Sequence, residues 1–286
     1  MVQVPALFRN AAARSLVCSE GIRDRSDVVL FGIDAGAGYA RRPRYDKTQG
    51  KPMSFNDKVV LVTGAAGNLG RAVAAAFAAA GASLVLVDLN EAVLTSAYPE
   101  QDARRLLLAA NLMEAASAQK AVEAALARFK RIDCLCNVAG GFRMGPPVHE
   151  TPADLWKLMM DLNAGTVLNM AQAVVPGMLA AGSGKIVNIG AGGGLKGGAR
   201  MAAYSASKSA VIRLTESMAA ELRDKGINVN CVLPSTIDTP QNRADMPKAD
   251  PKKWVTPEDL AQVMLFLCSD GARAIHGAAI PVNGLS

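Results

Sequence analysis

The chain has 286 residues, half of them hydrophobic, which is enough to bury the core of one large α/β domain or two small ones. It carries 31 Lys and Arg residues against 25 Asp and Glu residues, a net charge of +6. Residues 1–52 hold nine of the basic and five of the acidic residues, so +4 lies there and only +2 in the remainder. This excess is too small for a polyanion-binding surface, and we expect no nucleic acid partner.

Residues 1–52 lack sustained apolar periodicity and are rich in Gly, Arg and Pro, so we expect a mobile extension that the rest of the protein can do without. Met53 opens the run "MSFNDKVVLVTG", which favours Met53 as the natural start and 53–286 as the folded domain. The alternative is a targeting presequence in "ALFRNAAARSLVC". Acidic residues follow soon after it, beginning with Glu20 and Asp24, whereas a transit peptide is poor in acids.

No stretch of the sequence predicts a membrane-spanning helix, so we expect no membrane partner. The longest apolar run, 72–87, is interrupted by Gly81 and Ser83 and is followed by Asp88. The five cysteines are scattered and odd in number, and Cys134 and Cys136 alternate as on one face of a strand. We therefore expect core thiols in a reducing cytoplasm and no metal site.

From residue 57 onward, short β-rich runs alternate regularly with helical patterns. The predicted strands are 58–64, 83–89, 104–112, 133–140, 184–190, 227–234 and 278–284, and the predicted helices are 71–81, 114–130, 151–182, 202–224 and 257–270. Thr151 is the expected N-cap of its helix, with Pro152 at the first position, and 235–256 is expected to be irregular. The strands are apolar through their length, which indicates a parallel sheet covered on both faces. The fold class is thus α/β: a single doubly wound, Rossmann-type domain.

A glycine-rich turn joins the first predicted strand to the first helix, in the run "VTGAAGNLGRA". Gly64, Gly67 and Gly70 let the backbone approach a pyrophosphate, and the helix N-terminus beyond supplies unpaired N–H groups. Asp88 ends the second strand, where a carboxylate can accept both hydroxyls of an adenosine ribose and repel a 2′-phosphate. Neither Leu89 nor Asn90 is basic, so these residues predict NAD rather than NADP. The alternative is that Asp88 is a simple strand-end turn residue.

Tyr204 and Lys208, in "YSASK", are four residues apart and share one face of a predicted helix. A lysine ammonium beside a phenol favours the phenolate and lowers the phenol pKa from its ordinary value of about 10. The pair would then be a proton donor and acceptor usable nearer neutral pH. The alternative for such spacing is a solvated helix face.

These motifs, in this order, resemble those of the short-chain dehydrogenase/reductase family over nearly all of residues 57–284. The resemblance implies that Tyr204 is the catalytic acid/base, that Lys208 holds the nicotinamide ribose, and that Asn163 holds a water linking this lysine to solvent. "NVAG" departs from the family's Asn-Asn-Ala-Gly at Val138. The implied cofactor-binding residues are Gly64, Gly67, Asn68, Leu69, Gly70, Asp88, Asn111, Leu112, Asn137, Ala139, Gly140, Tyr204, Lys208, Pro234, Ile237 and Thr239.

The family places a serine thirteen residues before the tyrosine, where its hydroxyl bonds the substrate oxygen, and this chain has Ala191 there. Removing such a donor costs on the order of 10²–10³ in rate when an oxyanion forms. Quinonoid dihydropteridine reductases, a subset of the family, are similar in three respects: this alanine, the Gly-x-x-Gly-x-x-Gly turn, and the segment from 236 to Trp254. A quinonoid ring accepts hydride without an alkoxide-like oxygen that needs this donor.

Three functions remain open. The first is NADH-dependent reduction of a quinonoid or pterin-like compound, the second is an ordinary alcohol/carbonyl dehydrogenase weakened by Ala191, and the third is a non-catalytic nucleotide-binding protein. Tyr204, Lys208 and Asn163 together argue against the third. The family also implies a homo-oligomer, a tetramer, and the apolar faces on the 152–181 and 202–224 helices support this expectation. We expect the 235–256 segment to close over the nicotinamide site when cofactor binds.

Overall fold

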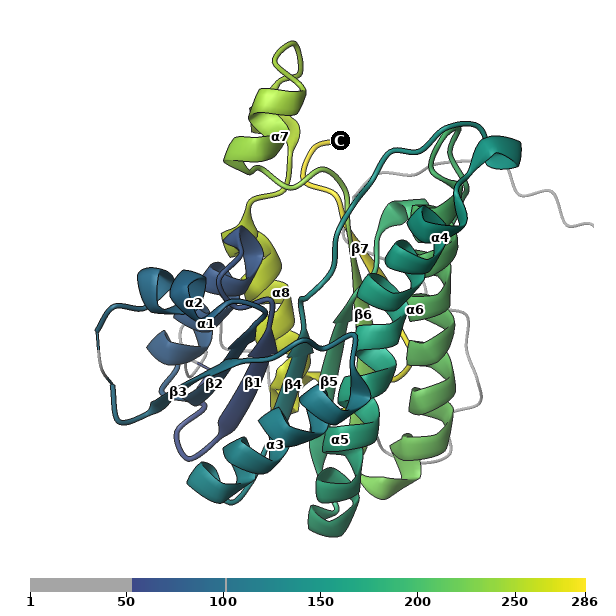
Figure 1. Ribbon diagram of the computed structural model, residues 1–286. Coiled ribbons are helices and arrows are strands. Elements are labelled where there is room, and N and C mark those ends of the chain that lie inside the picture. The colour runs from purple at the N-terminus through teal and green to yellow at the C-terminus, as the bar shows by residue number, and fades with distance from the viewer. Residues whose placement is uncertain (1–52, 101) are drawn as a thin grey trace, which may run out of the picture. The chain divides into compact units, whose positions relative to one another are not determined.

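The computed structural model describes residues 53–100 and 102–286, so the expectations for residues 1–52 lie outside the described residues. Seven strands form one sheet in the order β3-β2-β1-β4-β5-β6-β7, and every neighbouring pair is parallel (Figure 1). The strands are β1 (Val59–Thr63), β2 (Ser83–Asp88), β3 (Arg105–Ala109), β4 (Cys134–Asn137), β5 (Gly184–Ile189), β6 (Ile227–Pro234) and β7 (Ala279–Val282). The predicted doubly wound parallel sheet is confirmed.

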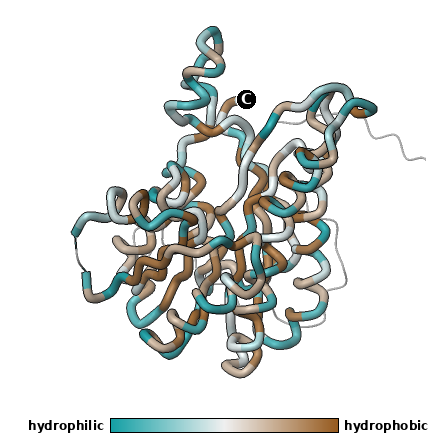
Figure 2. Tube along the Cα trace, viewed as in Figure 1, coloured by the Kyte–Doolittle hydropathy of each residue, from teal (hydrophilic) through white to brown (hydrophobic). Residues whose placement is uncertain are grey.

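The central strands are apolar on both sides because helices cover both faces of the sheet. Val60 and Val62 of β1 pack into one core cluster, whereas Val59 and Leu61 of the same strand pack into another. Helices α1 (Asn68–Ala79) and α8 (Pro257–Cys268) cover the first face, and α3 (Ala115–Phe129), α5 (Thr166–Ala181) and α6 (Ala202–Leu222) cover the second. Figure 2 shows the strands in the middle of the domain as apolar and the helices around them as a mixture of polar and apolar residues. This burial on two sides explains the uninterrupted apolar runs.

Two short helices were not predicted. Helix α2 (Glu91–Ala97) follows β2, and the side chain of Asn90 caps it by accepting hydrogen bonds from Ala92 N and Val93 N. Helix α7 (Pro240–Asp245) lies within the segment expected to be irregular, with Thr239 as its N-cap and Pro240 at its first position. Both N-terminal signals are present in the sequence. The helices escaped prediction because neither is long enough to show an apolar period.

The long predicted helix consists of three parts and begins later than expected. Helix α4 (Ala153–Met159) is followed by a π-helical stretch, Met160–Gly165, and then by α5. Thr151 is not the N-cap, because its hydroxyl donates to Pro147 O at 3.4 Å and the cap position is held by Pro152. The π-helical stretch carries Asn163, one of the predicted catalytic residues.

One helix among the described residues, Ala153–Ala181, is long and apolar enough to cross a membrane by length and composition alone, with a mean hydropathy of 1.3. Its α5 part packs against α3 and supplies Met170, Val174 and Met178 to the core beneath the sheet. Helices in the core of an α/β domain pass the same test. The expectation of no membrane partner stays a prediction.

Candidate functional site

A cleft of about 520 Å³ opens at the carboxyl ends of β1, β2 and β4, where the strand order changes direction. This is the edge at which open α/β sheets bind their ligands. The predicted cofactor residues that line it are Gly64, Gly67, Asn68, Leu69, Gly70, Asp88, Asn111, Leu112, Ala139, Gly140, Ile237 and Thr239. The structure thus gathers the glycine turn, the acid after β2, the "NVAG" segment and the segment after β6 around one cavity.

The glycine turn needs its glycines because the backbone passes very close to neighbouring segments. Gly64 has a φ of +61°, and a Cβ placed there would lie 2.9 Å from the Cα of Ala139. A Cβ at Gly70 would collide with the carbonyl oxygen of Gly64. Gly67 is the N-cap of α1, so the first free N–H groups of that helix start at the wall of the cleft. The turn therefore leaves the N-terminus of α1 open to the cleft, in a position that suits an anionic ligand.

Asp88 is held in place by the backbone on both of its oxygens. Oδ2 accepts a hydrogen bond from Ala66 N at 2.9 Å, and Oδ1 accepts one from Leu89 N at 2.8 Å. Each carboxylate oxygen has a second lone pair that remains available to a ribose hydroxyl. A base that the sequence argument did not weigh also lies nearby: Arg71 donates through Nη2 to Asn68 Oδ1 at 3.3 Å. Asn68 itself lines the cleft.

The loop after β4 is fastened to the end of β1 by a residue that sequence reasoning missed. Thr63 Oγ1 accepts hydrogen bonds from the backbone N–H groups of Val138 and Ala139, both at 3.0 Å. Asn137, expected to contact the cofactor, is buried and donates through Nδ2 to Asn188 Oδ1 at 2.9 Å. Four of the predicted cofactor residues do not line the cleft: Asn137, Pro234, Tyr204 and Lys208. The side chain of Asn137 ties β4 to β5, and its contact with a cofactor stays a prediction.

Two of the predicted catalytic residues converge beside Gly140. A Cβ built at Gly140 would lie 2.8 Å from Asn163 Oδ1 and 3.2 Å from Lys208 Nζ. Lys208 is buried, and its ammonium donates to the carbonyl oxygen of Ile189 at 2.8 Å. Gly140 lines the cleft and the other two residues do not, so the π-helical stretch and α6 place an amide oxygen and an ammonium directly behind the cleft wall at Gly140. A larger residue at position 140 would separate these groups.

The side chain of Asn163 links the loop after β4 to helix α6 through hydrogen bonds. It exchanges two hydrogen bonds with Gly141, accepting from its N–H and donating to its carbonyl oxygen, each at 3.0 Å. Its second amide hydrogen goes to Ser207 Oγ at 3.0 Å, and Ser207 in turn donates to Tyr204 O at 2.7 Å. Asn163 and Ser207 are both fully buried. Ser207 was not among the predicted site residues, although it directly precedes Lys208.

Burial governs the acidity of the tyrosine–lysine pair, and the expected effect of Lys208 on Tyr204 is wrong for this arrangement. Burial raises the pKa of Tyr204 to about 12. Burial also lowers the pKa of Lys208 to about 8, which weakens the cation expected to favour a phenolate. The sequence spacing is correct, but it carries no information on how much water each group loses.

No hydroxyl of the expected kind follows β5. Ala191 is buried in extended conformation ahead of three glycines, and a Cβ at Gly193 would lie 3.4 Å from Tyr204 Cε1. Ser205 is buried, and its Oγ has no hydrogen-bond partner among the described residues. Ser207 is engaged as described above. The structure therefore places glycine backbone and a methyl group where the family serine was expected.

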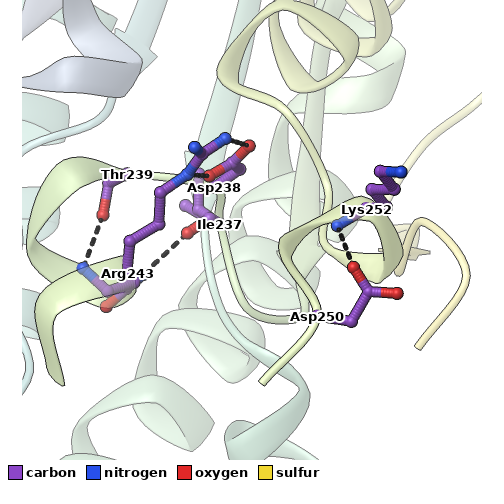
Figure 3. A network of polar contacts seen from close by, with 7 residues as sticks. Ile237, Asp238, Thr239, Arg243, Asp250 and Lys252 are labelled. Atoms are coloured by element: carbon purple, nitrogen blue, oxygen red, sulfur yellow. Dashed lines mark hydrogen bonds and ion pairs between the residues drawn. The ribbon is translucent and has the colours of Figure 1, made fainter. Parts of the chain in front are cut away.

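The 235–256 segment is held by its own polar contacts rather than being structureless (Figure 3). Thr239 Oγ1 accepts a hydrogen bond from Asn242 N at 3.1 Å, and Arg243 forms two bonds to Asp238, at 2.6 and 2.7 Å. The segment's far end is fixed because Trp254 is 9% exposed.

The comparisons with known proteins agree with this geometry. Residues 58–250 match the family model for short chain dehydrogenases. D-threitol dehydrogenase of Mycolicibacterium smegmatis is 35% identical over 80% of this chain and 93% of its own length, and cyclohexanol dehydrogenase of an Acinetobacter species is 34% identical over 80% and 95%. A crystal structure of NAD⁺-bound xylitol dehydrogenase aligns with a TM-score of 0.75 at 28% identity, covering 80% of this chain and 99% of the other. This chain therefore belongs to the short-chain dehydrogenase/reductase family of oxidoreductases.

Proposed function

We propose that the protein is an NAD(H)-dependent oxidoreductase of a small molecule, with Tyr204 as its acid/base. The observation that carries this proposal is the meeting of Asn163 and Lys208 at Gly140, which lines the same cleft as Asp88. A nicotinamide dinucleotide, when bound, supplies or accepts the hydride. The chain's own residues hold that group and move the proton.

The proposed roles follow from the contacts of each side chain. Tyr204 donates its phenolic proton to the substrate oxygen during reduction and takes it back during oxidation. The hydrogen-bond donors of Lys208 suit a ribose hydroxyl. Asn163 keeps the loop after β4 and helix α6 at a fixed separation, so that Lys208 stays beside Gly140. Replacing Tyr204 by Phe removes the proton donor and should abolish ketone reduction without changing NADH binding.

For the cofactor we propose NAD(H) over NADP(H). Asp88 faces the cleft with a fixed carboxylate, and a like charge repels a 2′-phosphate. We expect NADH to bind at least tenfold more tightly than NADPH in a fluorescence titration, and Asp88→Ala to narrow that gap. Arg71→Ala is the matched control. If this variant alone lost much of its affinity for NADPH, Arg71 would be the residue that binds the 2′-phosphate, and the preference for NADH would be contradicted.

For the substrate we propose a quinonoid or pterin-like ring compound, because Ala191 leaves no hydroxyl to stabilise an oxyanion. The second candidate is an ordinary alcohol or carbonyl dehydrogenase, favoured by the names of the threitol and cyclohexanol dehydrogenases. NADH oxidation measured against quinonoid dihydropterin, simple quinones and a panel of ketones separates the two. Failure of every acceptor, with NADH still bound, would support the third possibility, a non-catalytic nucleotide-binding protein.

We also propose a cytoplasmic homo-oligomer, most simply a tetramer. The outer faces of α5 and α6 border a groove of about 290 Å³, lined by apolar side chains such as Leu168, Val175, Pro176, Leu214 and Met218. Apolar surface of this kind is typical of subunit contacts. Light scattering at micromolar concentration tests the proposal, and a monomer would contradict it. Free, buried thiols, as at Cys134 and Cys268, agree with a reducing compartment.

A further inference from the structure

Phe142 contacts the proposed acid/base directly. Its ring centroid lies 4.9 Å from that of Tyr204, and the two planes are nearly perpendicular, at 88°. Phe142 is nevertheless 49% exposed, so about half of its surface faces outward. The residue before it, Gly141, is held by both hydrogen bonds to Asn163. The ring is therefore fixed beside Tyr204 while it keeps a face available to another molecule.

Most of the other groups around Tyr204 are apolar. Gly193 lies against the tyrosine ring, and the Cβ position of Gly193 is 3.6 Å from the Met201 methyl group and 3.8 Å from the Ser205 hydroxyl, the one polar group there. Ala191 contributes no hydroxyl, and Ser207 is fully buried and engaged with Asn163. A substrate oxygen that accepts the Tyr204 proton would thus have apolar surface around the carbons attached to it. A linear polyol would leave its further hydroxyl groups without partners on this surface, whereas a ring would not.

We propose that Phe142 is a specificity-determining residue that selects ring-shaped substrates over open-chain polyhydroxy compounds. The proposal rests on the proposed function, since it takes Tyr204 as the point where the substrate oxygen binds. An oxygen within hydrogen-bond distance of the phenol places the adjoining ring carbons next to Phe142. Perpendicular and offset contacts with an aromatic ring favour such carbons. The selected class therefore includes saturated cyclic ketones and planar quinonoid rings alike.

The test compares cyclohexanone with dihydroxyacetone as acceptors for NADH, using kcat/KM ratios, which do not depend on the absolute rate. Wild-type protein should favour cyclohexanone by at least tenfold. Phe142→Ala should lower kcat/KM for cyclohexanone by about tenfold, mainly by raising KM. It should change kcat/KM for dihydroxyacetone less than twofold, because only the cyclohexanone ring makes the contact that is lost. Phe142→Leu should fall between these. Phe266→Ala, at a phenylalanine of α8 that is 40% exposed, is the matched control and should change neither acceptor.

Equal losses on both acceptors in Phe142→Ala would overturn the proposal, because Phe142 would then only position Tyr204. A wild-type protein that prefers dihydroxyacetone, or that fails to reduce cyclohexanone, would overturn it as well. Tyr204→Phe, measured in parallel, separates this proposal from the proposed function. If that variant keeps full activity, the role of Tyr204 fails. If it loses activity on both acceptors while Phe142→Ala does not discriminate, only the specificity proposal fails.

Discussion

Replacing Ser207 by Ala removes the hydroxyl oxygen from the buried contact between the π-helical stretch and α6. The resulting loss in the free energy of unfolding follows from the hydrogen bonds that this oxygen makes. Tyr204 O loses the hydroxyl but keeps its place as an acceptor within α6. Asn163 loses the acceptor of its second amide hydrogen at 3.0 Å, and the other neighbour of that amide nitrogen, Met159 Sδ at 4.0 Å, is a weak acceptor, so the hydrogen stays buried and poorly satisfied. One unsatisfied buried donor costs about 1–3 kcal/mol. For a domain of this size, each kcal/mol lowers the melting temperature by roughly 2–4 °C.

Thermal unfolding followed by circular dichroism, together with turnover of NADH, measures the effect. We expect Ser207→Ala to melt at a lower temperature because of the lost hydrogen bond. We also expect its turnover to fall more than its affinity for NADH, because Lys208 is no longer fixed beside Gly140. Ser209→Ala is the control: this hydroxyl donates to Gly194 O at 2.6 Å from the same helix but does not contact Asn163. An unchanged melting temperature in Ser207→Ala, or equal losses of turnover in both variants, would refute the reasoning.

Three further predictions concern the same site. The pKa of Lys208 is lowered to about 8 from 10.5, so between these pH values the unfolded chain binds more protons than the folded one, and stability rises with pH. Between pH 7.5 and 9.5 the free energy of unfolding of the wild type should rise by about 2 kcal/mol relative to that of Lys208→Met, and parallel stability curves for the two proteins would contradict this. Ala191→Ser should raise turnover of simple ketones by up to about 10²-fold and leave a quinonoid acceptor unaffected, while no gain on any ketone would mean that the backbone there is displaced. Amide hydrogen exchange in 235–256 should slow when NADH is added, and unchanged exchange would argue against closure.

Most of the fold could be predicted from the sequence because burial on two faces leaves a direct mark on composition. The run "KVVLVTG" is apolar without alternation since Val60 and Leu61 face different cores, and every central strand repeats this pattern. The short capped helices left no such mark. Asn90 for α2, and Thr239 with Pro240 for α7, are the local signals, and residues of these types are common in loops.

The cofactor end of the site was more predictable than the reacting end. Gly64, Gly70 and Asp88 act through backbone geometry and charge, which follow from residue type and position along the chain. The contribution of Ser207 depends on a contact with Asn163 across forty-four residues of sequence, and no local pattern encodes it. The pKa of Tyr204 depends on burial by segments far away in the chain. Spacing alone therefore gave the wrong direction for that pKa.

The order of the strands also bears on how such a protein can change over evolutionary time. Gly64 follows β1 and Asp88 ends β2, on one side of the point where the strand order reverses, whereas Phe142 and Tyr204 follow β4 and β5 on the other side. Substitutions at positions such as Phe142 can alter the surface beside Tyr204 while the glycine turn and Asp88, on the other side, stay unchanged. After gene duplication, one copy of such an enzyme can thus change its substrate without passing through a form that no longer binds its cofactor.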